Sequence, residues 1–376
     1  MTRTIVDIHI LQTVPPSNLN RDDTGSPKTA VYGGVRRARV SSQAWKRAVR
    51  VAFATLLDGS QLGERTKRVG ESLAGRIVTA EPEFADRAVE LAASALKAAG
   101  LIKDKAKPAK GKQEPAAVES EYLLFLSSRQ LDLLAENAVA AARAGEEPDA
   151  KLFKTLVNAE HSVDIALFGR MVADLSDINV DAAAQVAHAI SVHAVDNEFD
   201  YFTAVDDRKE KASEQGAGMI GTVEFNSSTL YRYATVDVDR LHDNLGNAEA
   251  TRRAVEAFVT AFATSMPSGK QNTFANRTLP DAVVVRLRDS QPINFVGAFE
   301  DAVQDSEQSG RIQRSAARLA TYAADIERTY GEEPVRSWVS RVGDRTADLA
   351  VMGEDTAFKD LVVGLGDEVA LRLAKS

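Results

Sequence analysis

Hydrophobic positions along this chain recur with two periods, and each period predicts a different kind of element. Apolar and polar side chains alternate over residues 4–11, which predicts a strand. Over residues 42–57 the apolar residues instead recur every three or four positions, which predicts a helix, and Ser41 and Ser42 supply its N-cap. The apolar face of this helix consists of Trp45, Ala48, Val49, Ala52, Phe53 and Leu56.

The rest of the chain divides by composition and by period. Residues 12–40 are rich in Pro, Gly, Asn and Asp and are predicted as a loop, whereas residues 59–182 are predicted to be mostly helical. Strict alternation favours a strand over 184–195, although the alanine content also fits a helix. The remaining predicted elements are an irregular segment at 196–221, a strand at 222–236, a helix at 248–264 and a strand at 282–287.

Once the insertions are set aside, the predicted order is strand, helix, strand, strand, helix, strand. This is the βαββαβ pattern of ferredoxin-like domains, the fold of RNA-recognition modules. The sequence therefore predicts an α+β fold, in which a ferredoxin-like (RRM-like) palm carries a large helical insertion and an irregular one. The aromatic RNP1 pattern that stacks bases in such modules is missing, so base stacking on the sheet is not supported.

Composition narrows the class of protein. A chain of 376 residues favours two or three substructures. It contains no cysteine, which excludes disulfides and thiolate metal sites and fits a reducing compartment. It has neither an N-terminal apolar segment of the signal-peptide kind nor an apolar run of membrane-spanning length. We therefore expect a cytoplasmic protein with no membrane partner.

The charge pattern contains one local reversal of sign. The net charge is −8, yet residues 24–57 contain seven Lys or Arg and no Asp or Glu. Such a segment predicts an anion-binding surface, and its length favours a polyanion over one small phosphate. Gly33 and Gly34 would let the backbone approach this ligand closely. The seven cations are Lys28, Arg36, Arg37, Arg39, Lys46, Arg47 and Arg50.

The predicted helix at 42–57 places polar residues opposite its apolar face, and the free N–H groups of its first turn add partial positive charge. An ordinary amphipathic helix with a basic exposed side explains the helix alone. Together with the acid-free arm before it, the helix favours an RNA or DNA backbone as the ligand. The polar face consists of Gln43, Lys46, Arg47 and Arg50.

Four stretches of this sequence, in order and with matching spacing, are those of a known family. The longest is N-R-D-D-T-G-S-P-K-T-A-V-Y-G-G-V-R-R-A-R-V-S-S-Q-A-W-K-R at 20–47. The others are D-I-A-L-F-G-R-M at 164–171, D-Y-F-T-A-V-D-D at 200–207 and G-K-Q-N-T-F-A-N at 269–276. In these stretches the chain resembles the CasC family, the repeated backbone subunit of Cascade in type I-E CRISPR systems. The match covers the first sixty residues and about 160–300, and elsewhere only the helical character agrees.

The resemblance implies a non-catalytic subunit whose copies stack head to tail along a CRISPR RNA, together with other Cascade subunits. The thumb of each copy reaches the next copy and displaces one guide base at intervals, so that the bases between remain free to pair with target DNA. No cofactor and no metal are expected. The implied domains are a palm at 1–58, 183–193 and 223–376, the last part with C-terminal helices, helical fingers at 59–182 and a thumb at 194–222.

The resemblance also implies site residues. Met171 and Thr203 become the pair that flanks the displaced base, where a flexible thioether can serve as a sequence-tolerant wedge. Arg170 and Lys270 lie in matching stretches and join the predicted RNA-binding set with the remaining cations of the basic segment. Phosphate contacts position RNA without reading its sequence, as a subunit that accepts any guide requires. The family's phosphate ligands correspond to Arg21, Lys28, Ser41, Gln43, Lys46 and Arg50.

Two other classes of function stay open. Related backbone subunits of type III complexes cleave RNA with an aspartate in a comparable loop, so Asp22 and Asp23 could make this chain a metal-dependent endoribonuclease. The favoured interpretation is that both residues fold the loop through turn hydrogen bonds. A stand-alone single-stranded RNA-binding module is the third class.

Two further features are interpreted as structural. The five histidines lack the spacing of zinc ligands. The lysines of the 103–119 stretch are interpreted as part of a solvated loop, with weak attraction of duplex DNA as the lesser alternative.

Overall fold

The chain folds into two compact units in the structure, a computed structural model that describes residues 3–102, 119–172, 175–204, 219–304, 306 and 308–375. The sheet unit comprises Met1–Ala52, Gln185–Asp237 and Val255–Ser376, and the helical unit comprises Phe53–Ala184 and Val238–Ala254. The five lysines of the 103–119 stretch and the middle of the thumb, 205–218, lie outside the described residues.

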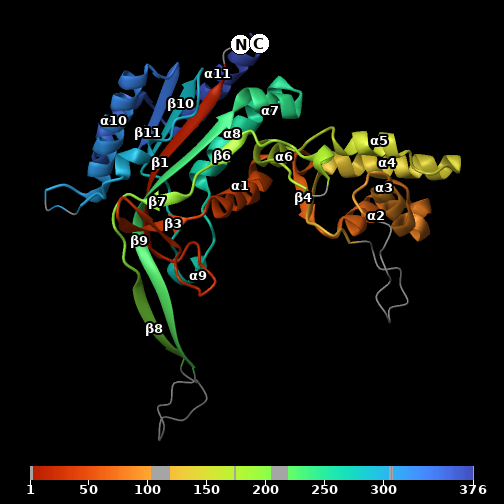
Figure 1. Ribbon diagram of the computed structural model, residues 1–376, viewed down its shortest axis with the longest axis horizontal. Coiled ribbons are helices and arrows are strands. Elements are labelled where there is room, and N and C mark those ends of the chain that lie inside the picture. Colours follow the sequence, from red (N-terminus) through yellow and green to blue (C-terminus); the bar gives the residue numbers. More distant parts are fainter. Residues whose placement is uncertain are drawn as a thin grey trace, which may run out of the picture. The chain divides into compact units, whose positions relative to one another are not determined.

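One large β-sheet organises the sheet unit (Figure 1). Its strands lie in the order β12-β11-β10-β1-β9-β7-β3-β2, while β6 and β8 also pair with β9. The strands are β1 (Ile5–Ser17), β2 (Thr29–Tyr32), β3 (Val35–Val40), β6 (Ala184–Val186), β7 (Ala189–Ser191), β8 (Glu198–Ala204), β9 (Met219–Asp237), β10 (Ala282–Arg288), β11 (Arg336–Arg341) and β12 (Glu354–Asp355).

The four strands predicted for the palm are neighbours in this sheet. They lie in the order β10-β1-β9-β7, and each of these pairs is antiparallel. The two predicted helices follow β1 and β9 in the chain, as expected: α1 spans Ser42–Leu56 and α8 spans Ala248–Thr264. The predicted α+β class is confirmed.

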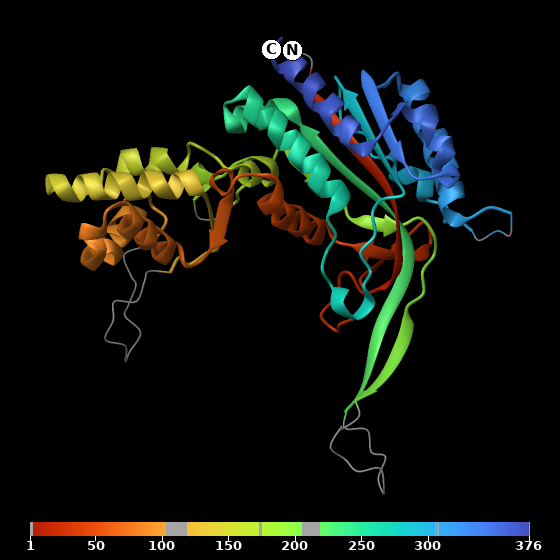
Figure 2. The ribbon, with the colours of Figure 1, turned by 180° about the vertical axis from the view of Figure 1, so that it is seen from behind.

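Helices cover both faces of the sheet, as the view from behind shows (Figure 2). On one face, α10 (Arg311–Tyr330) packs its Leu319 and neighbouring apolar residues against Leu11 and Val284. On the other face, α1 meets α8 through Trp45 and Phe262, whose rings are 6.4 Å apart. The same face carries α11 (Phe358–Leu373), where an added Cβ on Gly364 would lie 3.0 Å from the Trp338 side chain.

The predicted loop at 12–40 is wrong in two places. Strand β1 continues to Ser17, and β2 pairs with β3 as a hairpin. Gly33 and Gly34 form the turn of this hairpin, with φ of 58° and 77°, the left-handed conformation that a two-residue hairpin turn requires. An added Cβ on Gly33 would lie 1.7 Å from the Glu300 carbonyl oxygen, so this glycine approaches the protein's own backbone instead of a ligand.

The predicted thumb also differs from the structure. Instead of an irregular segment, its described residues form a two-stranded ribbon, in which β8 pairs antiparallel with β9 from Glu198↔Phe225 to Ala204↔Met219. The predicted strand at 184–195 is divided into β6 and β7. Alternating aromatic residues such as Phe199 and Tyr201 are typical of a strand, and they outweigh the acidic residues between them.

The helical unit contains the predicted helical segment and adds 238–254 to it. Its core is built from apolar residues such as Leu73, Leu96 and Leu134 on three different helices. A short antiparallel pair that the sequence did not indicate, β4 (Gly63–Thr66) with β5 (Leu124–Ser127), lies beside them. Its helices are α2 (Val69–Ala80), α3 (Ala88–Ala98), α4 (Ser128–Ala144), α5 (Ala150–Val157), α6 (Val163–Phe168) and α7 (Val238–Leu245).

His9 gives the sheet unit a pH-dependent stability. Its ring is buried, stacks on Phe295 at 4.5 Å and bonds to the Tyr231 hydroxyl at 2.9 Å. Burial, followed by the charges of Arg286 and Arg288, holds the pKa of His9 well below 6.5. The unfolded chain therefore binds a proton that the folded chain excludes, so stability falls as pH drops below about 6.5.

We predict that His9→Phe, which keeps a flat ring and removes the titrating group, flattens this dependence. Below pH 6, the unfolding free energy of the wild type should fall by about 1.4 kcal/mol more per pH unit than that of the variant. Urea titrations at pH 7.5, 6.5, 5.5 and 5.0 measure the two slopes. Parallel slopes would show that His9 is protonated in the folded protein.

Candidate nucleic-acid interface

The arm at 18–28 is held in a fixed conformation by side chains of the sheet unit. Buried Asn18 donates to the carbonyls of Gly25 and Glu224 at 2.9 and 3.0 Å. Asp22 Oδ1 accepts from the Thr24 hydroxyl and amide and from the Ser26 amide at 2.7 to 3.0 Å, and these bonds lower the pKa of Asp22. The arm is therefore preorganised, and Asp22 folds it as the favoured interpretation expected.

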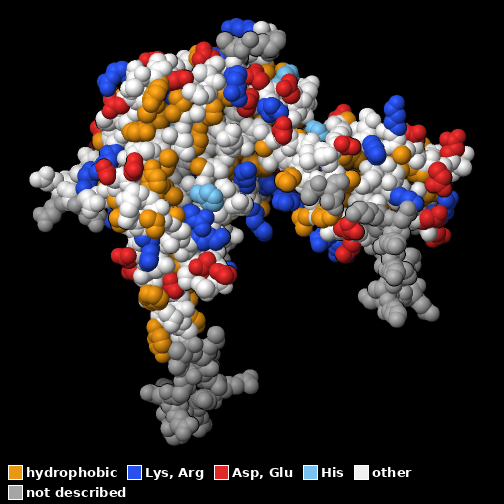
Figure 3. Space-filling view, viewed as in Figure 1, with side chains coloured by type: hydrophobic (Ala, Val, Ile, Leu, Met, Phe, Trp, Pro, Cys, Tyr) orange, Lys and Arg blue, Asp and Glu red, His pale blue; other side chains and the backbone are white. Residues whose placement is uncertain are grey.

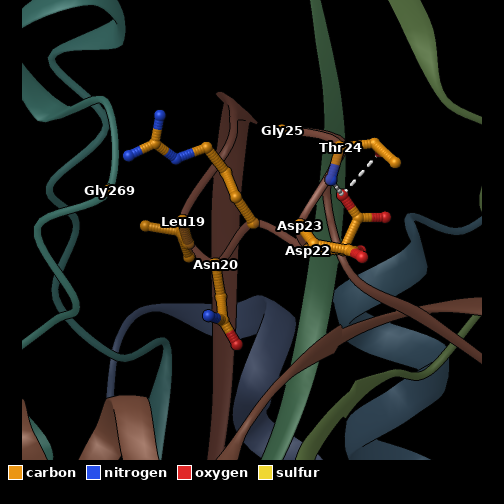
Figure 4. Close-up of a pocket in the computed structure, with 8 residues that line it drawn as sticks. Leu19, Asn20, Asp22, Asp23, Thr24, Gly25 and Gly269 are labelled. Carbon is orange, nitrogen blue, oxygen red and sulfur yellow. Dashed lines mark hydrogen bonds between the residues drawn. The ribbon is translucent and has the colours of Figure 1, made fainter.

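A pocket of about 530 Å³ opens against this arm. It is lined by residues 19–25 and by Gly269, which belongs to another of the four matching stretches (Figure 4). An added Cβ on Gly269 would lie 2.3 Å from the Leu19 carbonyl oxygen, so only glycine allows the two backbones to approach this closely. Two sequence stretches that lie far apart in the chain thus form one surface.

The arm is hydrogen-bonded to the N-terminus of helix α1. Asn20 Oδ1 accepts from the Ser41 amide at 2.9 Å, and Ser41 caps the helix by accepting from the Ala44 amide at 3.3 Å. Trp45 and Val49 are fully buried, which leaves the opposite face for the polar residues. The first turn contains no acidic residue, so its N–H groups keep their partial positive charge.

The predicted phosphate ligands differ in exposure. Arg21, Arg36, Gln43 and Arg47 are exposed, whereas Lys28, Arg39, Lys46 and Arg50 are half-buried. Burial lowers the pKa of Lys46. Figure 3 shows Lys and Arg side chains gathered over β3 and α1, so the basic segment forms one surface of the sheet unit.

One residue of this surface is not indicated by the sequence. His188, between β6 and β7, is exposed, and its Nδ1 lies 3.3 Å from the Arg39 guanidinium and 3.4 Å from the Ser42 amide. Partial burial, then the charges of Arg39 and Lys28, lowers the pKa of His188 below 6.5. The pairing of β3 with β7 brings it here, which histidine spacing alone does not indicate.

The structure contradicts the prediction that Arg37 binds RNA. Its guanidinium is fully buried and donates to the carbonyls of Tyr32, Ser191, Phe299 and Glu300 at 2.9 to 3.1 Å. All its described bonds go to backbone carbonyls, so Arg37 ties the β2–β3 hairpin to distant segments. Successive strand residues point to opposite faces, which is why its neighbour Arg36 is exposed.

Arg170 is also buried, contrary to its predicted role. In the helical unit it donates to the carbonyls of Ile178, Phe125 and Val157, at 2.7, 3.3 and 3.0 Å. Burial lowers its pKa to about 10, so it stays charged at neutral pH. The next residue, Met171, is 86% exposed. A charged side chain inside and an apolar one outside reverse the usual preference.

The other residues singled out from the sequence lie at several different places in the fold. Lys270 is half-buried and has a positive φ of 50°, uncommon for a residue other than glycine, at the start of the short helix α9 (Gln271–Phe274). Thr203 lies in β8 opposite Ile220, and it belongs to a different unit from Met171. Trp45 is core, as predicted, and Phe168 is half-buried and stacks on Phe53 at 6.3 Å.

Within the described ranges, no three His, Asp or Glu residues come together in a way that could hold a metal ion. None of the helices described is both long and apolar enough to cross a membrane.

Comparisons with known proteins agree with the architecture. The family model of CT1975-like protein matches residues 6–363. A chain of the solved "CRISPR RNA-guided surveillance complex, pre-nicking" is 36% identical, with a TM-score of 0.81, and the match covers 97% of this chain and 100% of that one. A chain of a second "CRISPR RNA-guided surveillance complex" is 33% identical, with a TM-score of 0.72 and coverage of 97% and 99%. No curated protein matches the sequence.

We predict that Arg37→Met and Arg36→Met, the same substitution at adjacent positions, differ sharply in stability. Arg37→Met leaves four carbonyls without their charged donor and should cost about 3 kcal/mol. Arg36→Met removes an exposed side chain and should stay within about 0.5 kcal/mol of wild type. Chemical denaturation measures both changes. Equal stabilities would mean that the carbonyls around Arg37 find other donors.

Proposed function

Because the chain belongs to the CT1975-like protein family, and its fold is that of a CRISPR surveillance complex subunit, we propose that it is the RNA-binding backbone subunit of a Cascade-type complex. In this role it binds the phosphates of a CRISPR RNA and stacks with copies of itself and with other subunits. The observation that carries the proposal is the preorganised basic surface made by the arm, β3 and α1.

The geometry supports contact with phosphates rather than with bases. Cations and the N–H groups of the α1 first turn share one surface, and both kinds of group bind phosphate oxygens. In contrast, the exposed aromatic residues Phe199 and Tyr201 lie on the β8–β9 ribbon. The surface can therefore hold any guide sequence by its backbone and leave the base edges for target DNA.

The ribbon supports contact with a second copy. Phe199 and Tyr201, 67% and 63% exposed, lie two positions apart in β8 and so share one face. Phe202 instead lies across Gly221, where an added Cβ would be 2.4 Å from its ring. Two exposed aromatic rings on a ribbon are costly in water, which favours a protein partner or an RNA base as their contact.

We propose a non-catalytic role because the arm uses Asp22 for its own fold. Three hydrogen bonds occupy its Oδ1. Among the described residues, no group of three His, Asp or Glu residues that could hold a metal ion includes Asp22 or Asp23. The alternatives remain an endoribonuclease that depends on Asp22 or Asp23 and a stand-alone RNA-binding module. Cleavage of bound RNA with Mg²⁺ would favour the first, and binding without fixed stoichiometry the second.

The basic face of α1 gives the central test of RNA binding. When co-expressed with a CRISPR array, the wild type should purify as a large nucleoprotein with a high ratio of absorbance at 260 to 280 nm. Lys46→Ala with Arg50→Ala should purify with little RNA. In titrations with single-stranded RNA, the salt slope should fall by about 0.7 for each phosphate that the variant no longer neutralises.

The matched control is Lys151→Ala with Lys154→Ala, which removes the same charge from exposed positions on α5. This control should bind RNA like the wild type. Melting temperatures separate lost binding from lost folding. Equal RNA loss in both pairs would show that net charge, not the α1 surface, governs binding, and a wild type without RNA would reject the proposal.

Met171 tests base displacement. We predict that Met171→Ser abolishes the constant interval of chemically reactive guide bases in assembled particles, because a small polar side chain does not replace a displaced base. Val351→Ser, at a position 82% exposed, is the control and should keep the interval. Uniform reactivity along the guide in the wild type would mean that no base is displaced.

A further inference from the structure

His188 lies at a point of the sheet unit where three positive features meet. Arg39 contacts its Nδ1 from β3, the Ser42 amide contacts the same atom from the first turn of α1, and the charge of Lys28 acts on it from the arm. The antiparallel pairing Arg39↔Ile190 holds β3 beside the residues that follow His188. The contact thus depends on the register of the sheet.

The two donors determine the tautomer of the ring. A guanidinium and a backbone amide can only donate, so Nδ1 must accept and carries no proton. The proton of the neutral imidazole then lies on Nε2, which becomes a hydrogen-bond donor on an exposed side chain. Arg39 acts here as a positioning residue, because it fixes the state of His188.

The positive charge at this point has no ion-pair partner among the described residues. Arg39 donates to the Thr29 carbonyl at 3.2 Å and to His188, and neither Arg39 nor Lys28 forms an ion pair with any residue that the structure describes. The first turn of α1 likewise contains no acid. Cations, helix amides and a fixed N–H donor together suit an oxyanion.

We propose that His188 is a phosphate ligand, whose neutral Nε2–H donates to a non-bridging phosphodiester oxygen of a bound RNA beside Lys28 and the N-terminus of α1. This inference rests on the proposed function and adds a residue outside the four matching stretches. Because the pKa of His188 lies below 6.5, the ring is a neutral donor at neutral pH. A neutral donor releases no counterion, so it strengthens binding without adding to the salt dependence.

Two substitutions distinguish the roles of the two ring nitrogens of His188. His188→Asn keeps an acceptor near the position of Nδ1 and loses the distal donor. His188→Gln can place an amide donor near the position of Nε2. With a fluorescein-labelled oligouridylate at pH 7.5, Asn should weaken binding about fivefold, with an unchanged salt slope, and Gln should restore most of the affinity. Lys28→Ala is the charged control, which should lower both affinity and slope.

Each outcome decides the inference. If the wild type binds RNA and His188→Asn binds equally well, the inference is wrong and the proposed function stands. If the wild type does not bind, both fail. A lower salt slope in His188→Asn would show a charged contact, and equal losses in both variants with lower melting temperatures would show a structural role. Nitrogen-15 NMR of the imidazole supplies an independent check, since protonated Nδ1 in the free protein would overturn the proposal.

Discussion

The basic surface depends on one buried cation, Arg232 of β9. Its guanidinium stacks on the Trp45 ring at 3.7 Å and on the Phe262 ring at 4.6 Å, so it joins the sheet to α1 and α8 at once. It donates to Gln12 Oε1 at 2.5 Å and to the Phe262 carbonyl. Burial lowers its pKa to about 9, but it remains charged at neutral pH. Because α1 is fixed in rotation by this contact, its polar face is always directed to the same side.

The same residue type serves two purposes within a few positions. Arg37 donates its hydrogen bonds to backbone carbonyls, whereas Arg36 beside it is exposed. Their side chains differ because successive residues of β3 point to opposite faces of the strand. Arg170 and Met171 show the same arrangement, with a buried arginine beside an exposed side chain, which is apolar here. In both pairs the bonds of the buried arginine hold the backbone beside an exposed residue to which we assign a role in RNA binding. We infer that preorganisation at both places depends on guanidinium bonds that contribute no charge to the ligand surface.

Periodicity predicted the helices that have one buried face, and β-forming composition predicted the central strands. Helices α1 and α8 lie within a few residues of their predicted bounds because apolar residues recur along one side of each. Strands β9 and β10 do so as well, although every residue of β10 is buried and only its apolar, β-branched composition indicates a strand. The β2–β3 hairpin lies in a segment whose Pro, Gly, Asn and Asp content predicts a loop, although Gly33-Gly34 between β-forming residues is a hairpin signal. The burial of Arg37 and the place of His188 were not predictable. Both depend on partners more than a hundred residues away, at Phe299 and at Arg39.

The distribution of charge explains how an acidic chain can bind a polyanion at one place only. At physiological ionic strength, charges farther apart than about 8 Å are largely screened, so the net charge of −8 acts weakly on RNA held at the basic surface. The absence of Asp and Glu from residues 24–57 therefore matters more than the net charge of the chain, because a single carboxylate at contact distance would offset a cation there. Asp22, just before this segment, keeps its charge, but turn hydrogen bonds occupy its Oδ1. Away from this surface the acidic excess would repel nucleic acid, which favours the arm, β3 and α1 as the place of the RNA binding that we propose.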